Sequence, residues 1–458
     1  MIRQAIILAA GQGRRIWPYN QVRNKCAIPI GNVPAVRRLA DDLLTLGVSR
    51  LVVVVGEHAA SVRYALRGLN SEIHYVTQDW HAGGTTGATL AAWDGGEPTL
   101  VVHGDMVTAR ENLAALLAAH KEGHTVATAL VVPLGRECPR DWIVAHLENG
   151  ALRGIEGHAR DGEYRLGGAL VLTPEARPYL CDHPGLVTQV PVGGMPPVEA
   201  DLAQSLQMMI DEGRPVRAVV ADEFVVDLDK PWHILEAHDR LMGYLTAQLQ
   251  ESVIPASARI HDGAEIQGHV VLGENAVIGN RVVINAPVWL GEGAGITNGA
   301  IVQGPSVFGA GTQVRDYCLV GSVAMGERGI IGHGAEFAGV AFDRVYLYHY
   351  CEIWGVLGSA VDIGAATVCG TLRFDDGIAE HRIRGRRELP VSDYANATFF
   401  GDYCRTGVNV IPMPGTKVGV YSCVGAGVVV YEDIPDRSLV LQKQELITRE
   451  WGPERYGW

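Results

Sequence analysis

The chain has 458 residues, 47% of them hydrophobic and 19% charged, and a formal net charge of −13 at pH 7. This length exceeds what one hydrophobic core usually holds, so we expect two or more domains. The acidic balance argues against general nucleic-acid binding, which needs a basic face, and no run reaches the roughly 20 apolar residues of a membrane span.

The region 1–232 alternates strand-like and helical segments. Short β-branched runs occur at Ala5–Ala9, Leu51–Val55 and Leu100–His103. Helical patterns lie between them at Pro34–Leu46 and Ala109–Ala119. Alternation of this kind predicts an α/β domain with a mainly parallel sheet.

A glycine-rich turn with two arginines follows the first predicted strand, in the run LAAGQGRRIWP at 8–18. Glycines allow the backbone to approach a phosphate chain, and arginines offer forked donors to its oxygens. A tight turn with surface arginines would look similar. The position after the first strand, where open α/β sheets bind their ligands, favours a nucleotide site.

The stretch Trp232–Gln250 predicts a helix that leads out of this domain, and the period then changes to six. One aliphatic or aromatic residue recurs at each sixth position, namely Ile254, Ile260, Ile266, Leu272, Ile278, Ile284, Leu290, Ile296, Val302, Phe308, Val314 and Val320. A hexapeptide period predicts short strands wound into a triangular prism. The tyrosine-rich stretch Asp343–Trp354 and the charged stretch Arg373–Asn396 interrupt the period, and we expect the second to project as a loop.

The run LAAGQGRRIWPYNQVRNKCAIPIGNVPAV from Leu8 resembles the signature LAAGxGTRLxPxTxxxPKxLxPVxxxP of sugar-1-phosphate nucleotidylyltransferases. The resemblance implies a Rossmann-like domain that transfers a nucleotidyl group from a nucleoside triphosphate to a sugar-1-phosphate with Mg²⁺. It implies Arg15 and Lys25 as catalytic residues that neutralise charge on the attacked phosphate. The nucleotide-binding residues that it implies are Leu8, Ala10, Gly11, Gly13, Arg14, Gln78, Gly84 and Thr85.

Two aspartates complete the implied site. Gly104-Asp105 resembles the metal-binding aspartate of the family, and FVVDLDKPW at 224–232 resembles its closing motif WxDIGxPWDLLEAN. The resemblance therefore implies Asp105 and Asp227 as metal ligands, and two carboxylates at strand ends suit a hard cation. Either aspartate alone is equally typical of a helix cap or an exposed turn.

The sequence departs from the family pattern in the region that meets the acceptor. The lysine of the EKP motif is missing near residue 157, where only Glu156 remains, although a neighbouring glycine signal is kept at Gly168. We predict Glu156, His158 and Gly168 as sugar-phosphate contacts. Either His158 or Arg160 replaces the missing lysine, or the acceptor is an unusual sugar or cyclitol phosphate.

The runs GVLGSAVDIGAAT at 355–367 and FGDYCRTGVNV at 400–410 resemble bifunctional glucosamine-1-phosphate acetyltransferase/uridylyltransferases of the archaeal type. The resemblance implies a left-handed parallel β-helix and a homotrimer or dimer of trimers. The family's acetyl-transfer side chains, carried over one at a time, fall on Gln303, Ala338, Thr371 and Tyr348, with His349 adjacent. Most of that pocket is therefore missing.

Three functions stay open. The chain is a nucleotidylyltransferase with a scaffolding β-helix, a bifunctional enzyme that also transfers an acyl group from acyl-CoA, or a non-catalytic regulatory or assembly subunit. We expect a nucleotidyltransferase domain at 1–232, a connecting helix at 233–252, a β-helix at 253–445 with a loop at about 373–396, and a tail at 446–458. Eight scattered cysteines without a CxxC pair favour a reduced, cytoplasmic setting, with no nucleic-acid or membrane partner.

Overall fold

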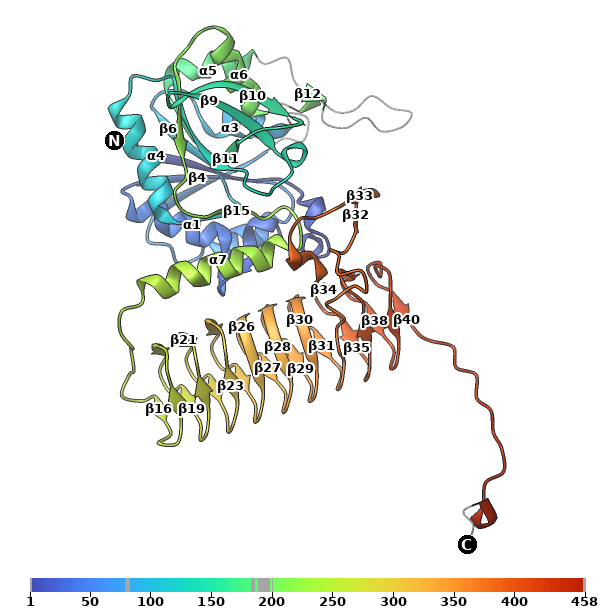
Figure 1. Ribbon diagram of the computed structural model, residues 1–458. Helices are drawn as coiled ribbons and strands as arrows, with labels where there is room; N and C mark the ends of the chain where they lie inside the picture. The colour runs from blue at the N-terminus through green and yellow to red at the C-terminus, as the bar shows by residue number, and fades with distance from the viewer. Residues whose placement is uncertain are drawn as a thin grey trace.

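An α/β domain stands on a long prism of stacked coils, from which the last residues extend as a tail (Figure 1). This computed structural model describes residues 2–78, 83–157, 159–182, 186–187, 198–199 and 201–455. None of the helices in these ranges is long and apolar enough to cross a membrane. The prediction of a Rossmann-like domain followed by a left-handed parallel β-helix is confirmed.

A nine-stranded sheet forms the centre of the N-terminal domain, in the order β5-β4-β1-β6-β11-β8-β14-β10-β9. Its strands are β1 (Gln4–Ala9), β4 (Arg50–Val55), β5 (Glu72–Thr77), β6 (Thr99–His103), β8 (Ala127–Pro133), β9 (Ile143–Glu148), β10 (Ala151–Gly157), β11 (Tyr164–Leu172) and β14 (Val216–Val220). The strands β5, β4, β1 and β6 are parallel, but β11 runs antiparallel to both β6 and β8.

The expectation of a mainly parallel sheet is therefore wrong, because the sheet is mixed. The strands β9 and β10 form an antiparallel hairpin, and β10 also pairs antiparallel with β14. A short connection can join antiparallel neighbours but not parallel ones, which need a long crossover. The two-residue link between β9 and β10 leaves no room for a crossover helix, so these two strands cannot be parallel, although β14 and β8 in the same half of the sheet do pair parallel.

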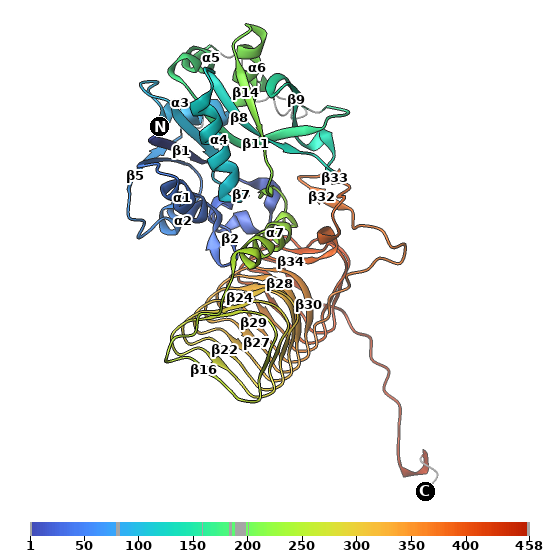
Figure 2. The same ribbon diagram turned by 60° about the vertical axis from the view of Figure 1, so that its left-hand side comes forward.

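Helices cover both faces of this sheet, as Figure 2 shows. They are α1 (Ala35–Thr45), α2 (Ala59–Ala65), α3 (Gly84–Ala92), α4 (Arg110–Glu122), α5 (Arg177–Cys181) and α6 (Leu202–Asp211). On β1, Ile7 packs in the core shared with α1, α2 and α4, while Ile6 packs in the core shared with α3, α5 and α6. Successive side chains of a strand point to opposite faces, so β1 is buried on both.

The C-terminal half is a β-helix whose coils stack in parallel register, seen almost end-on in Figure 2. One ladder contains ten strands, β16 (Arg259–Ile260), β19 (Val277–Ile278), β22 (Gly295–Ile296), β25 (Gln313–Val314), β27 (Ile330–Ile331), β29 (Tyr346–Leu347), β31 (Asp362–Ile363), β35 (Arg405–Thr406), β38 (Cys423–Val424) and β40 (Leu439–Val440). Another ladder includes β26 (Leu319–Met325), β28 (Glu336–Ala341), β30 (Glu352–Leu357), β34 (Thr398–Phe400) and β37 (Lys417–Val418).

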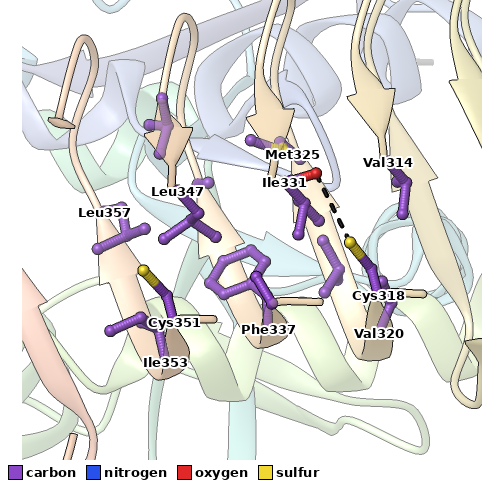
Figure 3. Close-up of a cluster of buried hydrophobic side chains, with 14 of the residues drawn as sticks. Val314, Cys318, Val320, Met325, Ile331, Phe337, Leu347, Cys351, Ile353 and Leu357 are labelled. Atoms are coloured by element: carbon purple, nitrogen blue, oxygen red, sulfur yellow. Dashed lines mark hydrogen bonds between the residues drawn. The ribbon is translucent and has the colours of Figure 1, made fainter. Parts of the chain in front are cut away.

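The tyrosine-rich stretch Asp343–Trp354 interrupts the six-residue period, as expected, but it does not interrupt the stack of coils. Early in the prism Ile278 pairs with Ile296 of the next coil, which is a step of three hexapeptides. In the tyrosine-rich region Ile331 pairs with Leu347, so this coil is shorter than three hexapeptides. The six-residue period is therefore lost while the stack continues, and both side chains point into the interior (Figure 3).

The α/β domain packs directly on one face of the prism through an apolar cluster that draws side chains from both. The connecting helix α7 (His233–Gln248) lies between them (Figure 1). The Tyr19 hydroxyl donates to the Val356 carbonyl at 2.7 Å, and the Arg23 guanidinium pairs with the buried Asp402 carboxylate. The segment that follows the predicted phosphate loop therefore packs directly on the β-helix.

The stretch predicted to project as a loop contains an ordered hairpin. Its strands are β32 (His381–Ile383) and β33 (Arg386–Glu388), and a short helical turn follows at Asp393–Asn396. The hairpin rises from the prism toward the α/β domain in both Figure 1 and Figure 2.

Candidate active site

The glycine-rich turn lies at the carboxyl end of β1, in the middle of the parallel half of the sheet. Gly13 has a φ of 59°, and a Cβ placed there would lie 3.2 Å from Lys25 Cβ. A Cβ on Gly56 would lie 2.5 Å from the Ala10 carbonyl oxygen, so the end of β4 closes on the turn. Both positions require glycine, because a side chain would displace the turn or the lysine.

Asn24, where the family pattern has proline, holds this turn together. Its side chain is 2% exposed, and its Nδ2 donates to the carbonyl oxygens of Ala9, Gly11 and Glu57 at 3.0, 3.2 and 3.2 Å. Its Oδ1 accepts from the Cys26 backbone nitrogen at 3.0 Å. One buried amide therefore fixes the backbone on both sides of the predicted phosphate loop.

Hydrogen bonds between neighbouring strand ends place the carboxylates beside this loop. The Gly104 nitrogen donates to the Leu8 carbonyl at 2.9 Å, and the Leu228 nitrogen donates to the Asp105 carbonyl at 3.1 Å. The second contact extends the antiparallel pair of β7 (Met106–Thr108) and β15 (Val225–Asp227). The two predicted metal ligands thus come from adjacent segments next to β1.

Each predicted catalytic cation is paired with a carboxylate. Lys25 Nζ forms an ion pair with Asp105, and Arg15 Nε lies 2.8 Å from Asp229 Oδ1. Lys230 Nζ contacts the other Asp229 oxygen at 2.9 Å. Burial lowers the pKa of Lys25, but Asp105 and Asp229 outweigh it and raise this pKa above its usual value. Lys25 therefore carries its charge at neutral pH.

Asp227 is held by Arg165, a fully buried arginine that the sequence did not single out. Arg165 Nη1 lies 2.9 Å from Asp227 Oδ2, and its Nε lies 2.9 Å from Glu137. The guanidinium also stacks 4.0 Å from the Trp142 ring centroid. Burial raises the pKa of Asp227 and Arg165 lowers it, with a net upward shift. The arginine thus fixes one carboxylate oxygen.

The remaining carboxylate oxygen fits a hard cation. Asp227 Oδ1 is buried and has no hydrogen-bond partner among the described residues. Carboxylate oxygens are the ligands that Mg²⁺ prefers, and it usually takes one or two of them together with substrate phosphates and water. In the described ranges no group of three or more acidic, histidine or cysteine side chains would hold a metal by itself. Asp105 and Asp227 therefore suit a metal that binds together with a phosphate substrate.

The family model of the MobA-like NTP transferase domain matches residues 5–252, more than half of the chain. The chain belongs to this family. The match begins at β1 and ends after α7, so it contains the loop, the cations and both aspartates of this NTP transferase.

Curated relatives match almost the entire chain. A bifunctional sugar-1-phosphate nucleotidylyltransferase/acetyltransferase of Sulfurisphaera tokodaii is 25% identical over 94% of this chain and 98% of its own length. The bifunctional protein GlmU of Methanococcus maripaludis is 28% identical over 97% of this chain and 98% of its own. Among solved structures, a UDP-glucose pyrophosphorylase complexed with UDP-glucose is 17% identical with a TM-score of 0.47, covering 53% of this chain and 100% of that one.

Of the predicted nucleotide-binding residues, Gly84 and Thr85 lie at the start of α3 in the NTP transferase domain, and Gln78 contacts it. Gln78 Nε2 donates to the Gly84 carbonyl at 2.9 Å, which places the glutamine against the first turn of the helix. The Thr85 hydroxyl accepts from the Leu202 nitrogen at 2.9 Å, so this side chain supports α6. Arg14 and Gly11 are exposed at the loop, and Leu8 is half-buried.

Among the predicted acceptor residues, the cation at a described position is Arg160, which is exposed. Glu156 is exposed on β10, and its only described partner is His146, with 3.5 Å between the carboxylate and Nε2. Gly168 has a φ of 74°, and a Cβ there would lie 3.2 Å from His103 Nδ1. His158 lies outside the described residues. These residues therefore do not define where the phosphate of the acceptor binds.

Sequence reasoning missed three charged residues of the site, Arg165, Asp229 and Lys230. Asp229 and Lys230 follow Asp227 in the motif DLDKP. They replace the glycine of the family motif and the residue after it, and this replacement could have indicated that both belong to the site. Arg165 gave no such signal, because a lone arginine in a strand pattern usually indicates an exposed position.

Proposed function

We propose that this NTP transferase is a sugar-1-phosphate nucleotidylyltransferase, which converts a nucleoside triphosphate and a sugar-1-phosphate into a nucleoside diphosphate sugar and pyrophosphate. The observation that carries the proposal is the clustering of Arg15, Lys25, Asp105 and Asp227 around one glycine-rich turn. A non-catalytic subunit would have no need for two cations and two carboxylates at the same strand ends.

The reaction needs positioning and charge neutralisation. A phosphate oxygen of the acceptor attacks the α-phosphorus in line, the new P–O bond forms, and the bond to the β-phosphate breaks with release of pyrophosphate. The attacking phosphate is already ionised, so no general base is required. Lys25 and Arg15 would exchange their carboxylate partners for phosphate oxygens and stabilise the charge that develops there.

Asp105 and Asp227 would hold a divalent cation, which we propose to be Mg²⁺. The cation would supply charge neutralisation at the phosphates. Arg165 keeps Asp227 in place by fixing its Oδ2, which leaves Oδ1 directed to the site. The nucleotide would contact the residues Leu8, Ala10, Gly11, Gly13, Arg14, Gln78, Gly84 and Thr85.

We propose that the β-helix is mainly a scaffold and a trimer interface. The side chains at the positions of the relatives' acetyl-transfer residues include Gln303, Ala338 and Thr371, none of which can bind an anion by charge. Tyr348 stacks on Tyr346 with 4.1 Å between ring centroids, an arrangement that suits packing better than proton transfer. Light scattering on the full chain would test the trimer, and a monomeric mass would exclude it.

The decisive experiment is pyrophosphate release from the purified chain with Mg²⁺. UTP, dTTP, GTP, CTP and ATP are each tested against a panel of sugar-1-phosphates and cyclitol phosphates. We expect release that requires one nucleotide and one acceptor and is abolished in Asp105→Asn, but not in Asp262→Asn on the exposed β-helix surface. A folded protein that binds no nucleotide would refute the proposal and favour the subunit alternative.

A further inference from the structure

The hairpin of β32 and β33 belongs to the β-helix half but reaches the transfer site, which is the cluster of Arg15, Lys25, Asp105 and Asp227. It is inserted between two coils and rises toward the α/β domain (Figures 1 and 2). Its two turn residues, Arg384 and Gly385, have φ values of 52° and 78°. Positive φ at both positions gives a tight two-residue turn, whose twist matches that of the flanking strands. The tip of the hairpin therefore has a defined shape.

Buried side chains fix the hairpin in place. His381 is 1% exposed and Ile383 is 5% exposed. The His381 ring lies 4.5 Å from the Trp232 ring, and its Nε2 lies 2.8 Å from the Ala395 carbonyl oxygen. Trp232 ends the motif that contains Asp227 and Asp229. The hairpin is thus attached to the same segment that carries the predicted metal ligand.

An ion pair connects the hairpin to the predicted catalytic arginine. Glu388 Oε2 lies 3.3 Å from Lys230 Nζ, which contacts Asp229 at 2.9 Å. The other oxygen of Asp229 contacts Arg15. A residue of the β-helix insertion is therefore separated from Arg15 by only two intervening side chains.

The strand register places Arg386 on the site-facing side of the hairpin. Residues directly opposite each other in an antiparallel pair point to the same face. His381 pairs with Glu388, and Ile383 pairs with Arg386, so these four share one face. Arg386 is two residues from Glu388 along the strand, about 7 Å. It is exposed and forms no ion pair or hydrogen bond with another described residue.

Arg387 provides a contrast within the same strand. It points to the opposite face, where its Nε lies 2.7 Å from Glu380. The six residues 382–387 contain four arginines in a chain whose net charge is −13. Such a local concentration of positive charge attracts anions, and guanidinium groups bind phosphate through paired hydrogen bonds.

We propose that Arg386 binds the phosphate of the acceptor sugar-1-phosphate. This inference rests on the proposed function and supplies the cation that the missing EKP lysine would have provided. The acceptor site is then completed by the β-helix half of the same chain. Arg386 offers donors to a phosphate oxygen that does not attack, so it binds the acceptor without removing its nucleophile.

The kinetic test compares Arg386→Ala with Arg387→Ala in the full chain. Loss of a charge-assisted hydrogen bond to phosphate corresponds to about a 10-fold to 100-fold weaker interaction. We expect KM for the acceptor to rise by that factor in Arg386→Ala, with KM for the nucleotide unchanged, and both constants to stay near wild type in Arg387→Ala. A rise in the nucleotide KM alone, or no change in either constant, would overturn the assignment.

A binding test separates this inference from the proposed function. Inorganic phosphate is titrated calorimetrically into the full chain with Mg²⁺ and a saturating non-hydrolysable nucleoside triphosphate, so that the triphosphate position is already filled. We expect phosphate to bind wild type and Arg387→Ala equally and Arg386→Ala at least about 10-fold more weakly. Equal binding to all three proteins, or no binding to wild type, refutes the role of Arg386 even if the chain is an active transferase. Inactivity of a wild-type protein that shows this pattern refutes the proposed function instead.

Discussion

The interior of the β-helix is held together by one repeated apolar contact, whereas the transfer site is held together by individual polar contacts. In the prism, one contact is repeated, since Ile278, Ile296 and Val314 occupy equivalent positions in successive coils and are almost completely buried. At the transfer site the contacts differ from residue to residue, and the Asn24 side chain alone accounts for four hydrogen bonds. Repetition spreads stability over many similar residues, whereas the site depends on single ones.

The two regions are nevertheless not independent. Asn32 Nδ2 donates to the Met325 carbonyl at 2.7 Å, and Trp17 Nε1 donates to Asp436 at 3.0 Å. These contacts join the segment that follows the phosphate loop to coils at different levels of the prism. The β-helix therefore supports the transfer site as well as stabilising itself, and substitutions in each region should separate these two effects.

Among changes of a single cation at the site, the largest effect on activity is expected from Lys25→Met. Removal of one group that stabilises developing charge typically lowers kcat by about 10² to 10³. We expect this loss in a protein that still folds, because Lys25 lies in the site and not in a hydrophobic core. Steady-state kinetics and thermal melting are compared with Lys121→Met, a change of the same type on the exposed surface of α4. An active Lys25→Met protein would show that another cation neutralises the α-phosphate.

The largest effect on stability is expected from Phe337→Ala in the prism. This ring is 2% exposed inside the stack shown in Figure 3, and truncation of a buried phenylalanine costs about 3 to 5 kcal/mol. Urea denaturation should show a lower midpoint, while kcat of the folded protein stays close to wild type. Phe374→Ala is the matched control, because Phe374 is fully exposed in the inserted segment. Equal midpoints for the two variants would mean that the coils do not unfold cooperatively.

The sequence predicted the prism well, because the residues that stabilise the prism recur at a short, regular spacing along the chain. A buried aliphatic residue at each sixth position is visible without knowledge of distant contacts, until the coil that follows Val314 becomes shorter. The mixed sheet was missed because strand direction depends on which distant segments pair. Family resemblance suggested Arg15, Lys25, Asp105 and Asp227, and the structure brings them close together.

What the sequence could not reveal were partners that come from far along the chain. Arg165 meets Asp227 from 62 residues away, and Glu388 meets Lys230 from another half of the molecule. Neither contact leaves a local pattern, because a single charged residue in a strand or loop is ordinarily solvated. Only the folded arrangement shows that these residues belong to the site.

A smaller effect on activity is expected from Asn24→Ala. The change leaves three carbonyl oxygens, of which that of Ala9 is buried, without the Asn24 donor, and the loop loses its fixed shape. We expect kcat/KM for the nucleotide to fall about 10-fold, less than in Lys25→Met, since the cations remain. Ser61→Ala removes the acceptor of the Asn24 backbone nitrogen and a donor to the His58 carbonyl, but it leaves the Asn24 amide in place and should cost less. Equal losses in both variants would show that the side-chain amide does not organise the loop.

The smallest expected effect is a pH dependence of stability. It arises at His381, where the hairpin contacts the prism. His381 Nδ1 lies 3.0 Å from Lys417 Nζ, which in turn contacts Asp433 at 2.9 Å. Burial, assisted by the Lys417 charge, lowers the pKa of His381 to about 3. An unfolded histidine has a pKa of about 6.5. Between these values the unfolded chain binds a proton that the folded chain does not, so stability is complete above about pH 6.5 and falls as the pH drops.

This linkage lowers the free energy of unfolding by at most about 1.4 kcal/mol per pH unit. The substitution His381→Gln keeps a donor for the Ala395 carbonyl but removes the titrating group, so this variant should lose less stability between pH 7.5 and pH 5 than wild type. Urea midpoints at the two pH values measure the difference, and His124→Gln on the exposed surface should follow wild type. If all three proteins lose stability in parallel, His381 binds a proton in the folded chain as readily as in the unfolded chain. The pKa of His381 is then not lowered by its surroundings.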